Sequence, residues 1–245
     1  MDRENEGDAA HWARLYARDV FLCCEVFRLA NERAGTHIVR LEQAPAIIGH
    51  ERFVALGRGA VVVEDRLQNE AREAFMAAVR RALVPARLAT MWAQALGFRV
   101  PEEFYFSALF ANLGELLIRY LAPARGRLVD EGLGKGRPWD GREADVLGFG
   151  QRDLGLALAR DWDLPQLLLE EPSASAGAMG KPSVVRGAVD VAGVLGFGGR
   201  DDRAGAGVFD PDGAGLVLGA ALQDRSLRRA RREAELIDEN LHASW

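Results

Sequence analysis

The chain has 245 residues, of which 49% are hydrophobic and 27% are charged. This is the composition of a soluble globular protein, and the length allows one large domain or two small ones with a sizeable core. The formal net charge is −5, which argues against nucleic acid as a partner because a nucleic-acid-binding face is basic. The N-terminus does not have the pattern of a signal peptide, so we expect a cytoplasmic protein.

The first quarter of the chain predicts a tail and several helices. Residues 1–8 are polar and acidic and are expected to be disordered, followed by a single helical domain over residues 9–245. Apolar residues recur every three or four positions from Ala9 to Ala34, which predicts one helix that Gly35 ends. Two shorter helices are predicted over residues 41–48 and 50–66.

A long helix is predicted from Asn69 to Gly97, and Pro85 should kink it or divide it in two. The most apolar stretch follows, from Phe104 to Leu121 (FYFSALFANLGELLIRYL). Its polar residues Asn112, Glu115 and Arg119 are spaced to share one helical face. Because the 18 residues contain two charges, we predict a central buried helix and not a membrane span.

The second half is predicted to contain shorter helices joined by polar segments. A connection is expected from Pro123 to Gly141, and helices over residues 142–148, 151–162 and 183–195, with a loop over residues 172–182. A glycine-rich excursion (196–215) and a C-terminal helix (216–245) complete the chain. No apolar–polar alternation supports a sheet, so the predicted fold class is all-α.

The inventory of metal ligands is small. No histidine occurs between His50 and His242, so the core helices cannot build a histidine-based metal site. We therefore expect no metal and no cofactor. A magnesium site made only of carboxylates stays open as the alternative, although no spacing singles out one group among Glu102, Glu103, Glu115, Glu143, Asp145 and Asp153.

One basic cluster lies near the C-terminus and consists of Arg228, Arg229, Arg231 and Arg232. Arg229 and Arg231 can pair with Glu233 and Glu235 at i, i+4, which favours a solvated helix face. The minority interpretation is a docking surface for an acidic protein partner.

The segment from Ala108 to Leu116 (ALFANLGEL) resembles the signature of the HD phosphohydrolase superfamily, usually G-L-L-H-D-I-G-K-L. The apolar frame and Gly114 agree, but Ala111 and Asn112 stand where that signature has His and Asp. This replacement resembles the HDOD (HD-related output domain) family, a non-catalytic relative of the superfamily.

Further stretches agree with the HDOD pattern in the right order. They are Arg28 to Asn31 (RLAN), Leu41 to Ala44 (LEQA), Ile47 to Gly49 (IIG), Glu143 with Leu147 to Gly155 (LGFGQRDLG), Trp162 to Pro165 (WDLP) and Val185 to Val194. Gln151 takes the place of a usual histidine, and Ser175 and Ala176 occupy the region of a histidine pair. The resemblance spans about residues 12–200 and implies a helical bundle of the HD type with a regulatory role in bacterial signalling.

The resemblance also locates a degenerate site. HD hydrolases use the adjacent His and Asp to hold the metal that generates hydroxide, whereas Ala111 has no lone pair and Asn112 is a weak neutral ligand. We therefore expect a non-enzymatic module that binds a signalling protein or a small ligand, and that can also form homo-oligomers. A polar network or small-ligand pocket is expected at Asn112, Glu115, Gln151 and Arg152. The alternative is a metal-dependent phosphohydrolase with a carboxylate-only site.

Overall fold

The computed structural model describes residues 9–35, 37–61, 63–131, 139–165, 167, 181–192 and 232. The fold is all-α, as predicted, and the ranges just given contain no strand. The elements are α1 (Ala9–Tyr16), α2 (Val20–Ala34), η2 (Leu41–Gln43), α3 (Ala44–Ile48), α4 (His50–Arg58), η3 (Val63–Asp65), α5 (Asn69–Ala95), α6 (Pro101–Leu109), η4 (Phe110–Asn112), α7 (Leu113–Leu121), α8 (Pro123–Glu131), α9 (Trp139–Leu147), α10 (Gln151–Asp161) and α11 (Lys181–Ala192).

The predicted helix over residues 9–34 is divided in two by Asp19. Its carboxylate accepts hydrogen bonds from the backbone nitrogens of Phe21 and Leu22, at 2.9 and 3.0 Å, and so caps the start of α2. The prediction of one helix was wrong because the apolar period continues across this cap. The predicted end at Gly35 is confirmed, since Gly35 adopts the left-handed conformation with φ 62°.

The two helices predicted within residues 41–66 lie where they were expected, but the second is shorter than predicted. Residues 41–48 form η2 and α3, whereas the helix that starts at His50 ends at Arg58 and not at residue 66. Gly59 closes it, with its backbone nitrogen bonded to the carbonyl of Ala55. Val63–Asp65 then forms only a single 3-10 turn.

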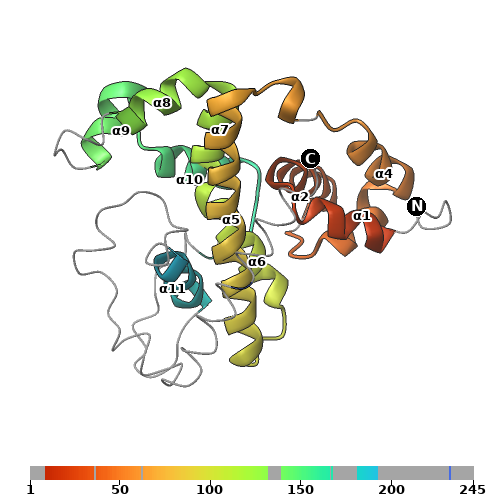
Figure 1. Cartoon of the computed structure of the whole chain (residues 1–245). Coiled ribbons are helices and arrows are strands. Elements are labelled where there is room, and N and C mark those ends of the chain that lie inside the picture. The colour runs from red at the N-terminus through yellow and green to blue at the C-terminus, as the bar shows by residue number, and fades with distance from the viewer. Residues whose placement is uncertain are drawn as a thin grey trace.

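Helix α5 is the central column of the described fold, with α6 and α7 beside it and α11 against its later turns (Figure 1). It continues through Pro85 as one 27-residue helix. Its first half carries Phe75, whose ring packs against those of Phe21 in α2 and Tyr120 in α7. These contacts join three segments that are far apart in the sequence around one apolar core.

The apolar segment around residues 104–121 was predicted as one helix and is in fact three elements, α6, η4 and α7. Every side chain from Phe104 to Phe110 is buried, which confirms the predicted central position. The backbone of Asn112, at φ −102° and ψ 14°, departs from α-helical values. The interruption therefore lies at one of the predicted site positions.

The predicted connection after Pro123 is wrong up to residue 131, because those residues form α8. Proline is well suited to the first turn of a helix, and Gly126 and Val129 are buried. Helix α11 starts at Lys181, two residues before the predicted cap Ser183. The predicted tail (1–8), the predicted loop up to residue 180, the glycine-rich excursion (196–215) and, apart from Arg232, the C-terminal helix (216–245) lie outside the described residues.

Within the part of the chain that the structure describes, no helix is both long enough and apolar enough to cross a membrane.

Candidate functional site

The side chain of Asn112 bonds to the backbone of α5. Its amide nitrogen Nδ2 lies 3.0 Å from the carbonyl oxygen of Arg81. In an ordinary helix this carbonyl would accept from the backbone N–H four residues later, but that residue is Pro85, which has none. The amide of Asn112 therefore supplies the donor that Pro85 lacks. A carboxylate could not take this role, because an ionised Asp accepts hydrogen bonds only.

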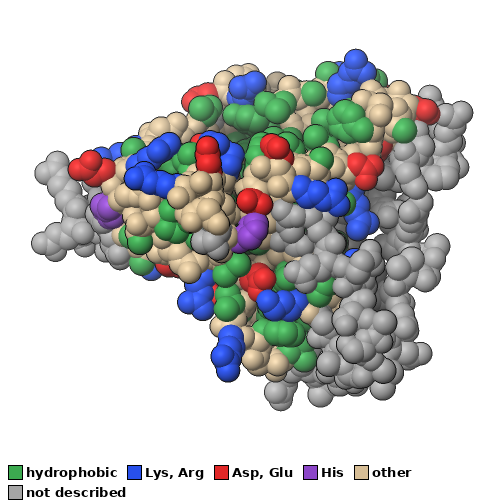
Figure 2. All heavy atoms as spheres, turned by 180° about the vertical axis from the view of Figure 1, so that it is seen from behind, with side chains coloured by type: hydrophobic (Ala, Val, Ile, Leu, Met, Phe, Trp, Pro, Cys, Tyr) green, Lys and Arg blue, Asp and Glu red, His purple; other side chains and the backbone are tan. Residues whose placement is uncertain are grey.

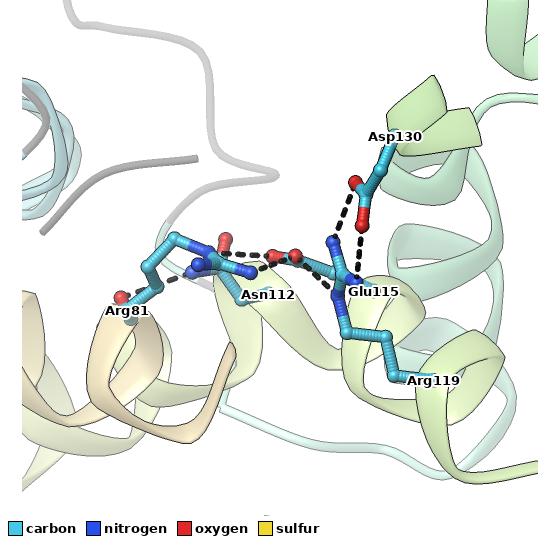
Figure 3. A network of polar contacts seen from close by, with 5 residues as sticks. All are labelled: Arg81, Asn112, Glu115, Arg119 and Asp130. Atoms are coloured by element: carbon cyan, nitrogen blue, oxygen red, sulfur yellow. Dashed lines mark hydrogen bonds and ion pairs between the residues drawn. The ribbon is translucent and has the colours of Figure 1, made fainter. Parts of the chain in front are cut away.

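The side chain of Arg81 starts a chain of ion pairs that runs from α5 through α7 to α8 (Figure 3). Its Nη2 and Nε donate to the two carboxylate oxygens of Glu115, the latter at 3.3 Å. Arg119 Nε lies 2.8 Å from Glu115 Oε1. The two Nη atoms of Arg119 also donate parallel hydrogen bonds to the two carboxylate oxygens of Asp130, at 2.9 and 3.1 Å. Two guanidinium groups thus alternate with two carboxylates, and the four charges balance.

The network is largely shielded from solvent, with side-chain exposures of 14% for Arg81, 12% for Glu115, 8% for Arg119 and 21% for Asp130. Burial alone would raise the pKa of Glu115, but the charges and hydrogen bonds of Arg81 and Arg119 outweigh it and lower the pKa. Burial alone would lower the pKa of Arg119, yet Asp130 and Glu115 raise it. Both groups are therefore held in their charged forms.

Helix α10 closes against this region at the start of its first turn. Gln151 is 5% exposed, and its backbone nitrogen donates to Oε2 of the buried Glu143 at 2.6 Å. A carboxylate at the N-terminus of a helix is favoured by the unpaired N–H groups and the helix dipole there. Spacing alone left Glu143 among six acids in the sequence, and only the resemblance to the HDOD pattern placed it together with the segment that contains Gln151.

Gly114 permits this close approach. A Cβ atom at Gly114 would lie 2.8 Å from the carbonyl carbon of Gln151, closer still to its oxygen, and 3.0 Å from the nitrogen of Gly155. The backbones of α7 and α10 therefore touch through Gly114. The glycine of the HD-like segment is needed here because there is no room for a side chain.

The predicted site residues divide into two groups. Ala111 and Asn112 lie in η4, Glu115 in α7 and Gln151 at the start of α10, and α10 packs against both η4 and α7. Arg152, by contrast, is exposed, and its positive charge acts on Asp190 of α11. Of the four predicted partner-surface arginines, Arg228, Arg229 and Arg231 lie outside the described residues.

Arg232, the fourth, is helical and exposed.

Sequence reasoning did not identify Arg81 and Asp130 as members of the network. Pro85 was the available signal for Arg81, because a proline inside a helix frees the carbonyl four residues before it. Asp130 carried no such signal, since α8 itself was not predicted.

Two of the HDOD-like stretches are joined by Asn31, which is 3% exposed. Its Nδ2 donates to the carbonyl oxygen of Asp163 at 2.6 Å, and its Oδ1 accepts from the backbone nitrogen of Ile38 at 2.7 Å. The RLAN and WDLP segments, more than 130 residues apart, therefore meet at one buried amide. Asp163 adopts a positive φ of 54° at this contact.

The HDOD domain family matches residues 3–175, well over half of the chain, and the protein belongs to this family. Among solved structures it is similar to the MmoQ response regulator of Methylococcus capsulatus strain Bath, with 19% identity over 96% of this chain and 79% of that one, and a TM-score of 0.54. An HDOD domain protein of unknown function from Geobacter sulfurreducens is 19% identical over 99% of this chain and 84% of that one, with a TM-score of 0.47. No curated protein matches.

Proposed function

We propose that this HDOD domain is a non-enzymatic module of signal transduction that acts by binding a protein or a small ligand. The observation that carries the proposal is the internal use of the HD-site residues. The amide of Asn112 is bonded to the backbone of α5, and the carboxylate of Glu115 lies between the guanidinium groups of Arg81 and Arg119. The polar groups that would serve a reaction are engaged in holding helices together.

The donor set does not suit a divalent metal. Hydrolase sites hold such ions with imidazole and carboxylate groups, and Ala111 and Asn112 replace the adjacent pair here. Glu115 is the one carboxylate in α7, and a dication beside it would face two fixed positive charges, Arg81 and Arg119. The described residues contain no group of three or more His, Cys, Asp or Glu side chains placed to share an ion.

Binding as the mode of action is supported by the fold and the surface. The fold is similar to that of the MmoQ response regulator. In the face shown in Figure 2, positive and negative side chains are interspersed among hydrophobic ones over the described residues. A partner of that face would therefore be recognised through shape and mixed contacts, since no large area of one charge is presented.

The proposal is tested by assaying phosphomonoesterase and phosphodiesterase activity with Mn²⁺, Mg²⁺, Fe²⁺ or Ni²⁺, on generic and nucleotide substrates. The wild type is compared with Asn112→Ala, with Glu115→Gln and with Glu73→Gln, a matched control on the exposed side of α5. We expect no turnover above background in any of the four proteins. Turnover in the wild type and the control that both site variants lose would overturn the proposal and favour the carboxylate-only hydrolase.

The C-terminal arginine cluster is proposed as one partner surface. Deletion of residues 224–245 is expected to leave a folded domain that no longer captures an acidic partner. A full-length variant with Arg228, Arg229, Arg231 and Arg232 changed to Ala should lose capture in the same way. Loss of folding on deletion, or undiminished capture by the alanine variant, would contradict this surface.

A further inference from the structure

We propose that Pro85, Arg81 and Asn112 form a latch across a joint in the middle of α5, and that the ion network couples this latch to α8. The latch is a property of the helices themselves. It holds whether or not the domain binds a partner, so it is tested independently of the proposed function.

The joint separates two arms of α5 that have different neighbours. Before Pro85, Phe75 packs against Phe21 of α2, with 6.0 Å between ring centroids, and against Tyr120 of α7, with 5.8 Å. After it, the Arg87 guanidinium lies 5.7 Å from the ring centroid of Tyr105 in α6. Movement at the joint would therefore shift α7 relative to α6 and would disturb α2, whose Phe27 also packs against Phe106 of α6 with 4.8 Å between ring centroids.

The same arm carries Trp92, which packs against α11: a Cβ atom at Gly187 would lie 3.2 Å from its ring. The α6 and α11 side of the fold is thus attached to the later arm. The earlier arm packs against α7, and α2 contacts both sides of the joint, through Phe21 on the earlier arm and through Phe27 on Phe106 of α6.

The joint is the weak point of the helix. Pro85 removes one i→i−4 hydrogen bond and leaves the carbonyl of Arg81 without its helical donor. Pro85 is itself buried, and a polar group that stays unpaired in such surroundings is costly. Asn112 closes the gap, so the closed joint depends on a single side-chain amide that comes from another element.

Arg81 is held at two points by residues three positions apart. Its carbonyl accepts from Asn112, and its guanidinium pairs with Glu115. Glu115 also pairs with Arg119, which grips Asp130 in α8. A shift of α8 that draws Asp130 away would therefore weaken the hold on Arg119 and, through it, on Glu115. Arg81, whose side chain helps to hold the joint closed, would then lose its partner.

A double-mutant cycle tests the latch. Asn112→Asp and Asn112→Leu keep the size of the side chain and remove its N–H donor. The first introduces a negative charge, and the second is apolar. Each should raise the unfolding equilibrium constant about 5- to 30-fold, the range for a buried polar group that loses its partner. Pro85→Ala restores a backbone N–H to the Arg81 carbonyl, so in that background the same changes should cost less than about 3-fold. Equal losses in both backgrounds would overturn the latch.

Hydrogen exchange tests the coupling to α8. Exchange of the backbone amides of residues 82–90 is compared in the wild type, in Asp130→Asn and in Glu131→Gln, a neighbouring acid of α8 that pairs with Arg127 and lies outside the network. We expect Asp130→Asn to speed exchange at the joint several-fold and Glu131→Gln to leave it unchanged. Unchanged exchange in Asp130→Asn, or equal effects of the two variants, would refute the coupling.

Discussion

Replacing Gly114 with alanine would add one methyl group where the backbones of α7 and α10 touch. Ordinary contact of a Cβ atom begins near 3.4 Å, whereas this one would lie 2.8 Å from the carbonyl carbon of Gln151. The obstacle is backbone, so no side chain can rotate away and the two helices must separate by more than 0.6 Å. Overpacking of this kind costs about 1–3 kcal/mol or more, and we expect the upper end, about 3 kcal/mol.

For a domain of this size about 3 kcal/mol lowers Tm by roughly 6–12 °C. The assay is thermal unfolding followed by circular dichroism. Gly59→Ala is the matched control, because Gly59 has φ −92° and an added Cβ atom there would meet its nearest atom at 3.4 Å. Gly155→Ala should fall between the two, since its nearest contact is 3.0 Å. A Gly114→Ala protein that melts within 2 °C of the control would refute the described approach of α7 and α10.

Three further predictions concern stability, pH and thiol chemistry. Asn31→Ala should cost about 2–3 kcal/mol in urea unfolding, because it leaves the backbone nitrogen of Ile38 and the carbonyl of Asp163 unpaired; a loss below about 0.5 kcal/mol would contradict it. The pKa of Glu115 is lowered by folding, so its ion pairs stabilise the fold above the unfolded-state pKa near 4.3 and lose that contribution as pH falls through the folded pKa. The stability gap between wild type and Glu115→Gln should therefore be largest near neutral pH and shrink on acidification below about pH 4, and a gap independent of pH would refute it. Burial raises the pKa of both Cys23 and Cys24, so a thiol reagent at pH 8 should label neither until the protein unfolds, and rapid labelling of the native protein would contradict their burial.

Local patterns predicted most of the helices because their causes lie close together in the sequence. Gly35 ends α2 through its own backbone conformation, and the apolar residues around Phe104 mark a buried segment without reference to any partner. The division at Asp19 was also a local signal, but the apolar period that continues across it concealed the cap. Helix α8 was missed because its nine residues include Pro123 and Gly126. Proline and glycine favour a loop when a segment is considered alone.

The sequence indicated which of these residues lie close together, but their arrangement could not be deduced. The order of the HDOD-like stretches indicated Ala111, Asn112, Glu115 and Gln151 together, and α10 does pack against η4 and α7. The bond from Asn112 to the Arg81 carbonyl joins residues 31 positions apart and depends on the register between two helices. Such a register follows from tertiary packing, which a pattern within one segment does not contain.

The ion network, too, could be predicted from the sequence only where its partners lie in one helix. Glu115 and Arg119 are four residues apart in α7, so their pairing follows from helical spacing. Their partners Arg81 and Asp130 come from two other helices, and only the assembled fold brings them together.

The proposed function requires that the HD-site residues serve internal contacts and not a metal ion. Isothermal titration of the purified full-length chain with Mn²⁺, together with metal analysis of the protein as isolated, tests it most directly. We expect no stoichiometric binding in the wild type and the same result for Glu115→Gln. One equivalent of tightly bound metal in the wild type that Glu115→Gln abolishes would contradict it.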